Sequence, residues 1–550
     1  MMNHLLNRLA IGLLSFSIVH AQTTPPPQLP AASSQAPQPT QAPQPAPTVS
    51  TPAVSPQAMQ NLGARLAARI NLIRQQDPRA DHAIWGISVV DLATGSSLYA
   101  ENANKLLQPA SNTKLFTTAT ALALVGPDYK FMTTVESMRR PDKSGRIAGD
   151  LFLVGHGDPN LSGRVLPYAK KTERLTPHTR VLEELADEVA LAGVKVIDGD
   201  IVGDDSDFLY ERYADGWTQD DLMWDYGAPV SALTVNDNLV FASIKPGERL
   251  GARALLTLDP YTSYYSVRNL VTTSAPGTLR NIGILREPGS LDVTFWGTIP
   301  IGDPGDDEAL AIEDPATCNA QFFRDLLLQH GVIVRGKARA QHSEPWQYPP
   351  PQNNQPLVVP AATAPARMIL AQHQSVPLIE DLRVINKISQ NLHVEIMLRL
   401  IGKLHGVSGS VSGGLDAESK FLSEQVHIDP AEIALHDGSG LSRSGLATPH
   451  AFTQLLQYAY AQPWAAQFRD TLPVAAEDGS LSTRFKGTFA ADHVEAKTGQ
   501  LGEVNSLSGY AVTKQGHNIA FSIIINHHTL GNTKAKQMID DIVNAILEED

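Results

Sequence analysis

Cysteine is nearly absent from this chain. Its 550 residues include one cysteine, Cys318, so no disulfide can form within the chain. Free cysteines are usually buried and structural, and a nucleophilic one needs a placed histidine and a lowered pKa. The surrounding sequence, EDPATCNAQFFRDLL, predicts the start of an amphipathic helix. We therefore expect Cys318 to be a core residue.

Positive charge is in deficit. The chain has 43 Lys and Arg residues against 57 Asp and Glu, which gives a formal net charge of -14 at pH 7. Proteins that bind nucleic acids need a surplus of Lys and Arg on one face. The composition therefore argues against a nucleic-acid partner.

Metal and cofactor motifs are also lacking. The sequence contains no phosphate-binding loop and no dinucleotide fingerprint. His393 and Glu395 lie two residues apart on an expected helix, where they cannot face one metal ion. His527 and His528 have no third ligand at metal spacing. We expect no metal and no cofactor.

Long apolar runs are missing as well. Arg8 precedes an apolar run from Leu9 to Val19, which is shorter than a stable membrane-spanning helix requires. The following His20-Ala21 completes a small-residue cleavage site for a signal peptidase. We predict a signal peptide over residues 1–21, no stable membrane span, and a periplasmic mature protein. A retained N-terminal anchor is the alternative.

The next segment has no charge at all. No charged residue occurs between Arg8 and Arg65, and residues 22–57 consist mainly of Pro, Ala, Gln, Thr and Ser. Such a composition cannot bury enough apolar surface to offset its chain entropy. We predict a disordered, solvated linker.

Periodicity indicates order from about residue 58. Helical spacing over residues 59–73 predicts a first helix, and two strands joined at Thr94-Gly95 precede a helix over 111–124. Between about 140 and 375, short β-like runs separated by Gly, Pro and Asp predict inserted β-rich modules, ending in a surface connection over 347–365. Helical periodicity returns over 379–404, and the chain ends in a hairpin and a helix over 533–547.

The first motif with chemical content is Ser111-Asn112-Thr113-Lys114. Positions three apart share a helix face, so the amine of Lys114 can lie beside the hydroxyl of Ser111. Serine is a weak nucleophile until a base accepts its proton, and a desolvated lysine can be that base. A helix start also offers the backbone N–H of Ser111 to a developing oxyanion. Taken alone, the motif is common by chance.

Two further motifs follow. Ser389-Gln390-Asn391 places a hydroxyl and an amide two residues apart, suited to relaying a proton to a leaving amine, although a polar helix cap has the same pattern. Lys497-Thr498-Gly499 precedes an expected strand. A cation and a hydroxyl on a strand edge suit a terminal carboxylate, and a glycine lets a substrate backbone approach. A turn beside a solvated lysine is the alternative.

Together and in this order, the motifs match the joint pattern S-x-x-K, S-D-N and K-T-G of penicillin-binding proteins and class A β-lactamases, with Gln390 replacing the middle Asp. The chain resembles the D-alanyl-D-alanine carboxypeptidase/endopeptidases of the class C, low-molecular-mass penicillin-binding type. The long gap between the first two motifs is similar to that family's habit of inserting two domains. Further resembling stretches are GHGDP (155–159), GAP (227–229), SAL (231–233), DGSGLSR (437–443) and LPVA (472–475).

The resemblance implies a role for each motif residue. Ser111 would be acylated, Lys114 would be the base, and Ser389 with Asn391 would complete the proton network. Substrate binding would fall to a set that holds the terminal carboxylate and the oxyanion, namely Lys497, Thr498, Gly499 and the backbone N–H of Gln500. Family members usually carry Thr or Ser at the position of Gln500, so one carboxylate contact departs from the pattern.

A substrate-side aspartate is a further implication. In relatives, an aspartate of the inserted domain faces the active site and meets the free amine of a diaminopimelate side chain. The stretch GWTQDDLMWDYGAP places Asp221 at the matching position, with Tyr226 nearby. Asp220 and Asp225 are competitors for this role.

The resemblance also implies a fold. We expect an α+β multidomain protein in which residues 58–140 and 375–550 form a β-lactamase/transpeptidase-like domain, an antiparallel sheet flanked by helices. Residues 141–374 would form two inserted β-rich domains, the second nested at about 240–345.

The expected activity is serine-type D-Ala-D-Ala carboxypeptidase and endopeptidase action, with peptidoglycan stem peptides and β-lactams as partners. A β-lactamase or esterase with the same motifs is one alternative, and a catalytically weak peptidoglycan-binding scaffold is another. The sequence leaves the oligomeric state open.

Overall fold

The computed structural model describes residues 56–172, 174–350, 356–359 and 366–549. The predicted signal peptide lies outside these residues, and so does the predicted linker except for its last two residues. Residues 351–355 and 360–365 of the expected surface connection also lie outside them. Residues Ser55–Asp550 form one unit. In the described part of the chain, no helix combines the length and apolarity that a bilayer crossing requires.

The two ends of the chain build one antiparallel sheet. Its strand order is β2-β1-β24-β23-β22, so a strand near the N-terminus, β1, pairs with the last strand, β24. The bounds are β1 (Ile84–Asp91), β2 (Ser97–Glu101), β22 (Val494–Leu501), β23 (Val504–Val512) and β24 (Asn518–Asn526). Strand β24 is buried along almost its whole length because helices cover both faces of the sheet.

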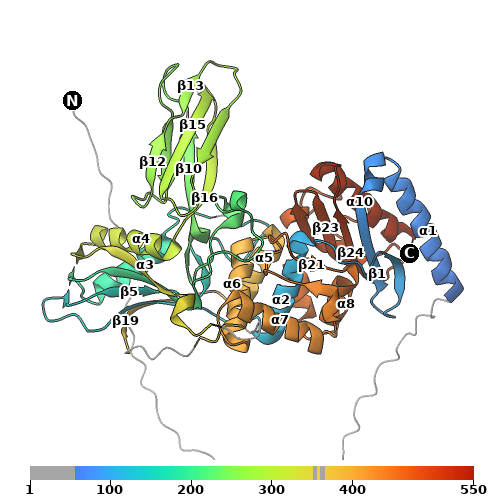
Figure 1. Ribbon diagram of the computed structural model, residues 1–550, viewed down its shortest axis with the longest axis horizontal. Coiled ribbons are helices and arrows are strands. Elements are labelled where there is room, and N and C mark those ends of the chain that lie inside the picture. The colour runs from blue at the N-terminus through green and yellow to red at the C-terminus, as the bar shows by residue number, and fades with distance from the viewer. Residues whose placement is uncertain (1–55, 173, 351–355, 360–365, 550) are drawn as a thin grey trace, which may run out of the picture. The chain divides into compact units, whose positions relative to one another are not determined.

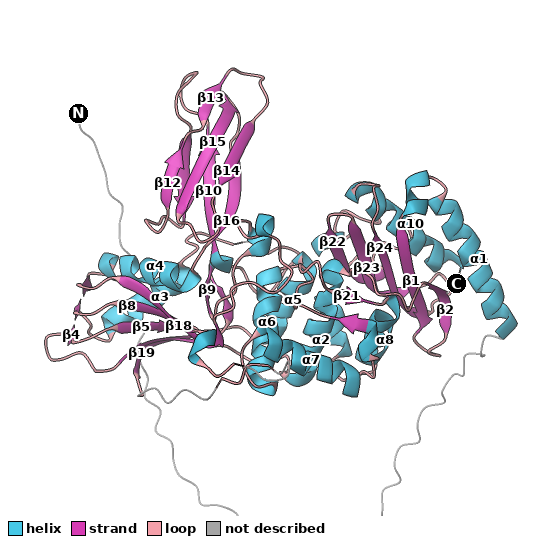
Figure 2. Cartoon of the chain, in the orientation of Figure 1, coloured by secondary structure: helices cyan, strands magenta, loops and turns pink. Residues whose placement is uncertain are grey.

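Helices α1 (Pro56–Arg74) and α10 (Asn532–Glu549) cover one face of this sheet, and α8 (Pro449–Tyr460) packs on the other (Figures 1 and 2). In α1, the side chains of Leu62, Leu66, Ile70 and Ile73 are buried, so the predicted amphipathic helix is confirmed.

A helical group lies beside α8 and carries two of the three motifs. It contains α2 (Lys114–Leu124), α5 (Leu378–Ile388), α6 (Asn391–His405), α7 (Val411–Glu424) and α9 (Ala465–Thr471). The helical region expected over 379–404 consists of two helices, α5 and α6. They separate at Ser389, whose φ of 66° is left-handed, and the Gln390 side chain caps the second helix.

The middle of the chain contains a mixed sheet of order β18-β8-β5-β3-β19. Its strands are β3 (Met132–Ser137), β5 (Leu151–Val154), β8 (Ile201–Leu209), β18 (Ala338–Ser343) and β19 (Met368–Gln374). Helices α3 (Arg180–Leu191) and α4 (Pro315–Gln329) pack on it, and the fully buried Cys318 lies in α4 as predicted.

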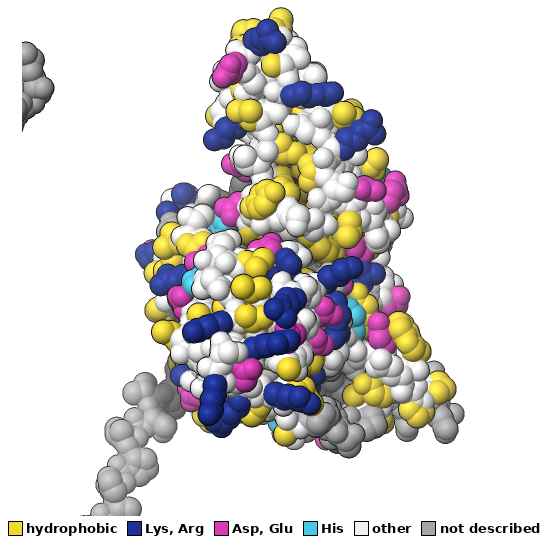
Figure 3. Space-filling view, turned by 90° about the vertical axis from the view of Figure 1, so that its left-hand side faces the viewer, with side chains coloured by type: hydrophobic (Ala, Val, Ile, Leu, Met, Phe, Trp, Pro, Cys, Tyr) yellow, Lys and Arg dark blue, Asp and Glu magenta, His cyan; other side chains and the backbone are white. Residues whose placement is uncertain are grey.

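Figure 3 shows Lys and Arg side chains interspersed with Asp and Glu on one side of the molecule.

Two smaller sheets project from this region (Figure 1). One has the order β11-β10-β16, and in the other β15 pairs with β12, β13 and β14. The bounds are β10 (Leu239–Lys245), β11 (Leu255–Asp259), β12 (Ser266–Asn269), β13 (Thr272–Ser274), β14 (Asn281–Leu285), β15 (Asp292–Pro300) and β16 (Asp306–Ala311). The short strands are β4 (Arg146–Ile147), β6 (Asp158–Leu161), β7 (Val196–Ile197), β9 (Leu233–Val235), β17 (Ile333–Val334), β20 (Ile433–Ala434) and β21 (Leu446–Ala447). The predicted domain bounds themselves stay a prediction.

Candidate active site

Ser111 lies in a short 3-10 turn, Ala110–Thr113, that leads directly into α2. The Nζ atom of Lys114 is 2.9 Å from Ser111 Oγ, as expected for residues three apart in a helical turn. Ala110, immediately before the serine, has a φ of 49°, a left-handed conformation that is costly for a residue with a side chain. The turn thus presents the hydroxyl of Ser111 to the amine of Lys114.

Lys114 is completely buried among oxygen atoms. Its Nζ donates to Asn391 Oδ1 at 2.6 Å and to the Ser439 carbonyl at 2.7 Å. Burial lowers the pKa of Lys114 to about 7, against the opposing effect of the nearby Asp437 and Glu395. A substantial fraction of the amine is therefore neutral near pH 7 and able to accept the proton of Ser111.

Ser389 and Lys497 meet across the same site. Lys497 Nζ donates to Ser389 Oγ at 2.9 Å and to the Thr498 carbonyl at 2.7 Å. Burial and the charge of Lys114 lower the pKa of Lys497 well below its usual value. The structure therefore brings together five predicted residues from three separate segments.

Strand β22 forms the edge of the sheet at the site, and Gly499 allows its close approach to the nucleophile. A Cβ atom on Gly499 would lie 2.2 Å from Ser506 Oγ, 2.7 Å from the Pro109 carbonyl and 3.1 Å from the Ser111 backbone N. The neighbouring Thr498 Oγ1 lies 2.8 Å from Ser480 Oγ. Gln500, which follows Gly499 in the chain, is exposed.

A tight turn, residues 437–440, supplies the carbonyl that holds Lys114. Asp437 accepts hydrogen bonds from Ser439 Oγ at 2.9 Å and from the Gly440 N–H at 2.8 Å. Glu395 Oε1 accepts the backbone N–H groups of Gly438 and Ser439 at 2.9 and 2.8 Å. The two carboxylates therefore fix the position of the Ser439 carbonyl.

The sequence alone does not predict the support that Glu395 gives to this turn. Glu395 is completely buried and also contacts Arg399 at 3.2 Å. A charged residue in the middle of an apolar helix segment was the only signal, and it does not name a partner.

We expect Gly440→Ala to damage the site. Gly440 has a φ of 74°, and an added Cβ would lie 1.9 Å from the Ala110 carbonyl oxygen. Moving that backbone displaces Ser111, so we expect a loss of at least about 2 kcal/mol in the free energy of unfolding and about a hundredfold loss in the rate of acylation by benzylpenicillin. Denaturant titration and stopped-flow acylation measure the two effects.

The matched control is Gly277→Ala. Gly277 has a similar φ of 79°, but nothing lies within 4 Å of the added Cβ. It should cost only the local backbone strain and leave acylation unchanged. Equal acylation rates for the two variants would contradict the proposed contact between Gly440 and the nucleophile turn.

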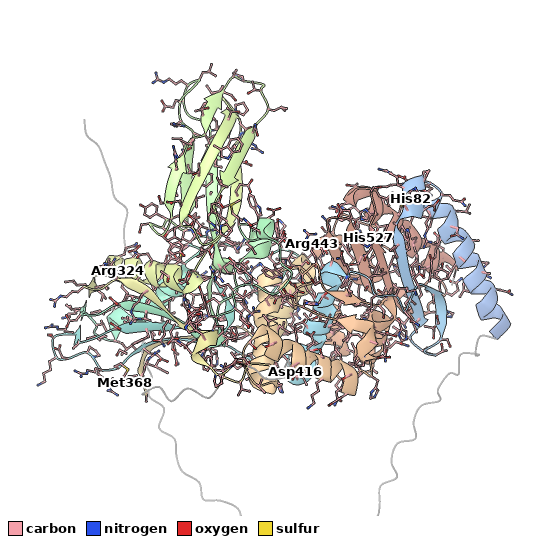
Figure 4. The ribbon with its side chains drawn as sticks, viewed as in Figure 1. His82, Arg324, Met368, Asp416, Arg443 and His527 are labelled. Carbon is pink, nitrogen blue, oxygen red and sulfur yellow. The ribbon has the colours of Figure 1, made fainter. Side chains whose placement is uncertain are left out.

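A loop from the middle of the chain, residues 216–226, reaches the site. Trp217 Nε1 donates to Asp437 Oδ2 at 3.0 Å, and Tyr226 contributes a carbonyl that accepts from Asn391 Nδ2 at 2.8 Å. Arg443, labelled in Figure 4, follows the 437–440 turn, and its backbone N–H donates to the carbonyl of Gly216 at 3.2 Å. The loop therefore contacts the groups that surround Lys114.

Asp221, the predicted partner of a substrate amine, lies in this loop. Its carboxylate is buried and accepts hydrogen bonds from the backbone N–H and the hydroxyl of Thr218, at 3.3 and 2.7 Å. Asp220 and Asp225 are exposed. The role of Asp221 stays a prediction, with Asp220 and Asp225 as its competitors.

Gln390, the departure from the S-D-N pattern, faces a carboxylate. Its Nε2 donates to Asp237 Oδ2 at 2.9 Å, and its Oε1 accepts the Leu392 N–H at 3.0 Å. Burial acts to raise the pKa of Asp237, but Arg164 and His393 hold it well below its usual value. An aspartate at position 390 would set a second carboxylate against Asp237, which the amide avoids.

His393 lies in an ionic cluster with Asp237 and Asp381. His393 Nδ1 is 2.6 Å from Asp381 Oδ1, and its Nε2 is 3.2 Å from Asp237 Oδ1. Among the described residues, no group of three His, Cys, Asp or Glu side chains has the arrangement of a metal site.

The fold and the site define a class of protein. An antiparallel sheet flanked by helices, a serine with a buried lysine one helical turn away, a Ser-x-Asn segment and a Lys-Thr-Gly edge strand together define the serine acyl-transfer enzymes of the transpeptidase/β-lactamase type. Residues 66–548 match the D-Ala-D-Ala carboxypeptidase 3 (S13) family, and the chain belongs to this family.

Similar proteins agree with this assignment. The D-alanyl-D-alanine carboxypeptidase of Actinomadura sp. (strain R39) is 34% identical over 465 residues, which cover 82% of this chain and 80% of that protein. The D-alanyl-D-alanine carboxypeptidase DacB of Haemophilus influenzae is 25% identical over 450 residues, 79% of this chain and 84% of that protein. The predicted family and the prediction of an enzyme are confirmed.

The fold has a solved counterpart. The crystal structure of penicillin binding protein 4 (dacB) from Haemophilus influenzae superposes with a TM-score of 0.72 at 21% identity, covering 87% of this chain and 99% of that chain. The predicted fold class, an α+β multidomain protein with a transpeptidase-like domain, is confirmed.

Proposed function

We propose that this enzyme hydrolyses D-Ala-D-Ala bonds of peptidoglycan stem peptides through an acyl-enzyme on Ser111, as both a carboxypeptidase and an endopeptidase. The observation that carries the proposal is the 2.9 Å separation between Ser111 Oγ and a fully buried Lys114 whose pKa is lowered to about 7. A serine with a neutral amine at this distance has its base in place.

The proposed reaction uses these groups in turn. The proton of Ser111 passes to Lys114 as Oγ attacks the carbonyl of the penultimate D-Ala. The backbone N–H groups of Ser111 and Gln500 receive the oxyanion, and the proton returns through Ser389 to the leaving amine as the amide bond breaks. Water then attacks the ester on Ser111, and Lys114 accepts its proton.

Substrate binding is assigned to the strand edge and the inserted loop. Lys497 and Thr498 hold the carboxylate next to the scissile bond, and Gly499 lets the peptide approach strand β22. Asp221 is the proposed contact for a side-chain amine. β-Lactams are the proposed inhibitors; a related protein of Dictyostelium discoideum, 26% identical over 481 residues, is named penicillin-sensitive carboxypeptidase A.

The location and layout are part of the proposal. An exported protein, cleaved after residue 21 and acting in the periplasm, meets its substrate where peptidoglycan lies. The proposed catalytic domain comprises residues 58–140 and 375–550, and the two inserted domains fall within 141–374.

The proposal is tested by mixing the purified wild-type protein with benzylpenicillin and following its intact mass, and by measuring D-Ala release from a pentapeptide. We expect a lasting adduct of one penicillin on Ser111 and release of D-Ala. A fleeting adduct with hydrolysed drug and no D-Ala would favour a β-lactamase. Peptidoglycan binding with neither adduct nor D-Ala would favour a scaffold.

A further inference from the structure

A polar cavity of about 200 Å³ adjoins the Ser-x-Asn segment. Its lining includes Ser389, Gln390 and Asn391 of this segment together with Arg164 and Arg174. Neither arginine has a catalytic or substrate-binding role in the proposed reaction. The cavity therefore extends the active site toward the inserted region.

The arginines leave hydrogen-bonding capacity unused. Arg164 Nη2 donates to Asp237 Oδ2 at 2.6 Å, and Arg174 Nη1 lies 3.2 Å from the same oxygen without the geometry of a hydrogen bond. Within the described residues, Arg164 Nε and Arg174 Nη1 are buried and have no hydrogen-bond partner. The Arg164 side chain is 2% exposed, so water offers little compensation.

The carboxylates of the cavity leave these two N–H groups without a hydrogen-bond partner. Asp237 is shared by both arginines, His393 and Gln390. The other lining carboxylate, Asp225, is exposed and accepts the backbone N–H of Tyr226. A guanidinium with a free N–H in a partly dry cavity is suited to a further carboxylate.

The position of the cavity relates it to one side of the scissile bond. Ser389, which lines it, is the proposed donor of a proton to the leaving amine, and Lys497, 2.9 Å from Ser389 Oγ, is the proposed partner of the carboxylate next to that amine. The cavity therefore adjoins the proposed leaving side of the scissile bond.

We propose that Arg164 and Arg174 form a leaving-group subsite that binds a carboxylate of the peptide attached to the leaving amine, beyond the carboxylate held by Lys497. The inference rests on the proposed function and deepens it. A cross-linked peptide has such a carboxylate on its leaving side, whereas a single leaving D-Ala does not. The subsite thus favours the endopeptidase reaction over the carboxypeptidase reaction.

Three synthetic cross-linked peptides and one monomeric pentapeptide test this subsite. The first cross-linked peptide has free carboxylates. In the second, the leaving-side carboxylate beyond the one assigned to Lys497 is amidated. In the third, only the acyl-side carboxylate is amidated. For the wild-type enzyme we expect leaving-side amidation to lower kcat/KM about tenfold, the value of one charge-assisted hydrogen bond. Acyl-side amidation should leave kcat/KM unchanged.

The variant is Arg174→Gln, which keeps a polar side chain of similar length. Dividing each rate by the rate on the monomeric pentapeptide corrects for any loss of folded enzyme. The tenfold preference for the free leaving-side carboxylate should fall to about one. Arg180→Gln, an exposed arginine of α3 that pairs with Glu184, is the matched control and should retain the preference.

Two results would overturn the subsite: no preference in the wild type, or a preference that Arg174→Gln retains. A fall in kcat/KM on acyl-side amidation would show that the arginines bind a carboxylate on the acyl side of the substrate. That result would also overturn the leaving-group subsite. Wild-type enzyme that hydrolyses neither the pentapeptide nor any cross-linked peptide would contradict the proposed function itself.

Discussion

Ser111→Ala is expected to lower hydrolysis of D-Ala-D-Ala peptides by about 10⁴- to 10⁶-fold and to abolish the penicillin adduct. The reason is that the ester forms on this oxygen: Ser111 Oγ is the hydroxyl that lies 2.9 Å from the buried amine of Lys114. D-Ala release measured by a coupled assay and intact mass after exposure to benzylpenicillin report the two losses.

The matched control for this variant is Ser97→Ala, an exposed serine of strand β2, which should keep full activity and the adduct. Thermal unfolding should place both variants close to the wild type, because Ser111 loses only one small hydroxyl. A penicillin adduct that persists in Ser111→Ala would move the nucleophile to another residue.

Lys114→Met should reduce acylation by benzylpenicillin by about 10³-fold or more, the contribution of a general base. Methionine fills similar volume but supplies no proton acceptor to Ser111. It also leaves Asn391 Oδ1 and the Ser439 carbonyl without the donor that they have in the wild type. We expect a loss of about 1–3 kcal/mol in the free energy of unfolding from these unpaired acceptors.

The rate of acylation of the wild-type enzyme should change with pH as Lys114 loses its proton. The pKa of Lys114 is lowered to about 7, so the amine is charged below that pH and neutral above it. Acylation should therefore rise about tenfold per pH unit below pH 7 and level off above it. Stopped-flow acylation between pH 5 and pH 9 measures the profile.

Two comparisons test this assignment. The residual rate of Lys114→Met should show no inflection near pH 7, and the exposed Lys105→Met should keep the wild-type profile. An unchanged inflection in Lys114→Met would assign the titrating group to another residue, with the buried Lys497 as the first candidate.

Local sequence determined the parts of this site that are close together in the chain. A spacing of three residues placed Ser111 and Lys114 on one helix face, and the order of the three motifs predicted the family and the fold class. Helical periodicity predicted α1, α2 and α10, because a buried helix face repeats within the segment itself.

Tertiary structure decided which distant groups meet. Ser389 and Lys497 are 108 residues apart and meet only because the sheet places β22 beside the start of α6. The pKa of Lys114 depends on complete burial, which no local pattern encodes. A motif can name a lysine, but the surrounding fold determines whether that lysine is a base.

The same distinction applies to Glu395 and Arg174. Glu395 supports the 437–440 turn by accepting backbone N–H groups, and Arg174 lines a cavity that Ser389 and Asn391 also line. Neither lies within a recognisable motif. Periodicity and motifs encode contacts along one element, so the sequence by itself determined the family, the fold class and the identity of the reacting groups. Pairings between elements depend on how the sheets and helices pack, so the tertiary structure decided which groups meet and whether Lys114 can be a base.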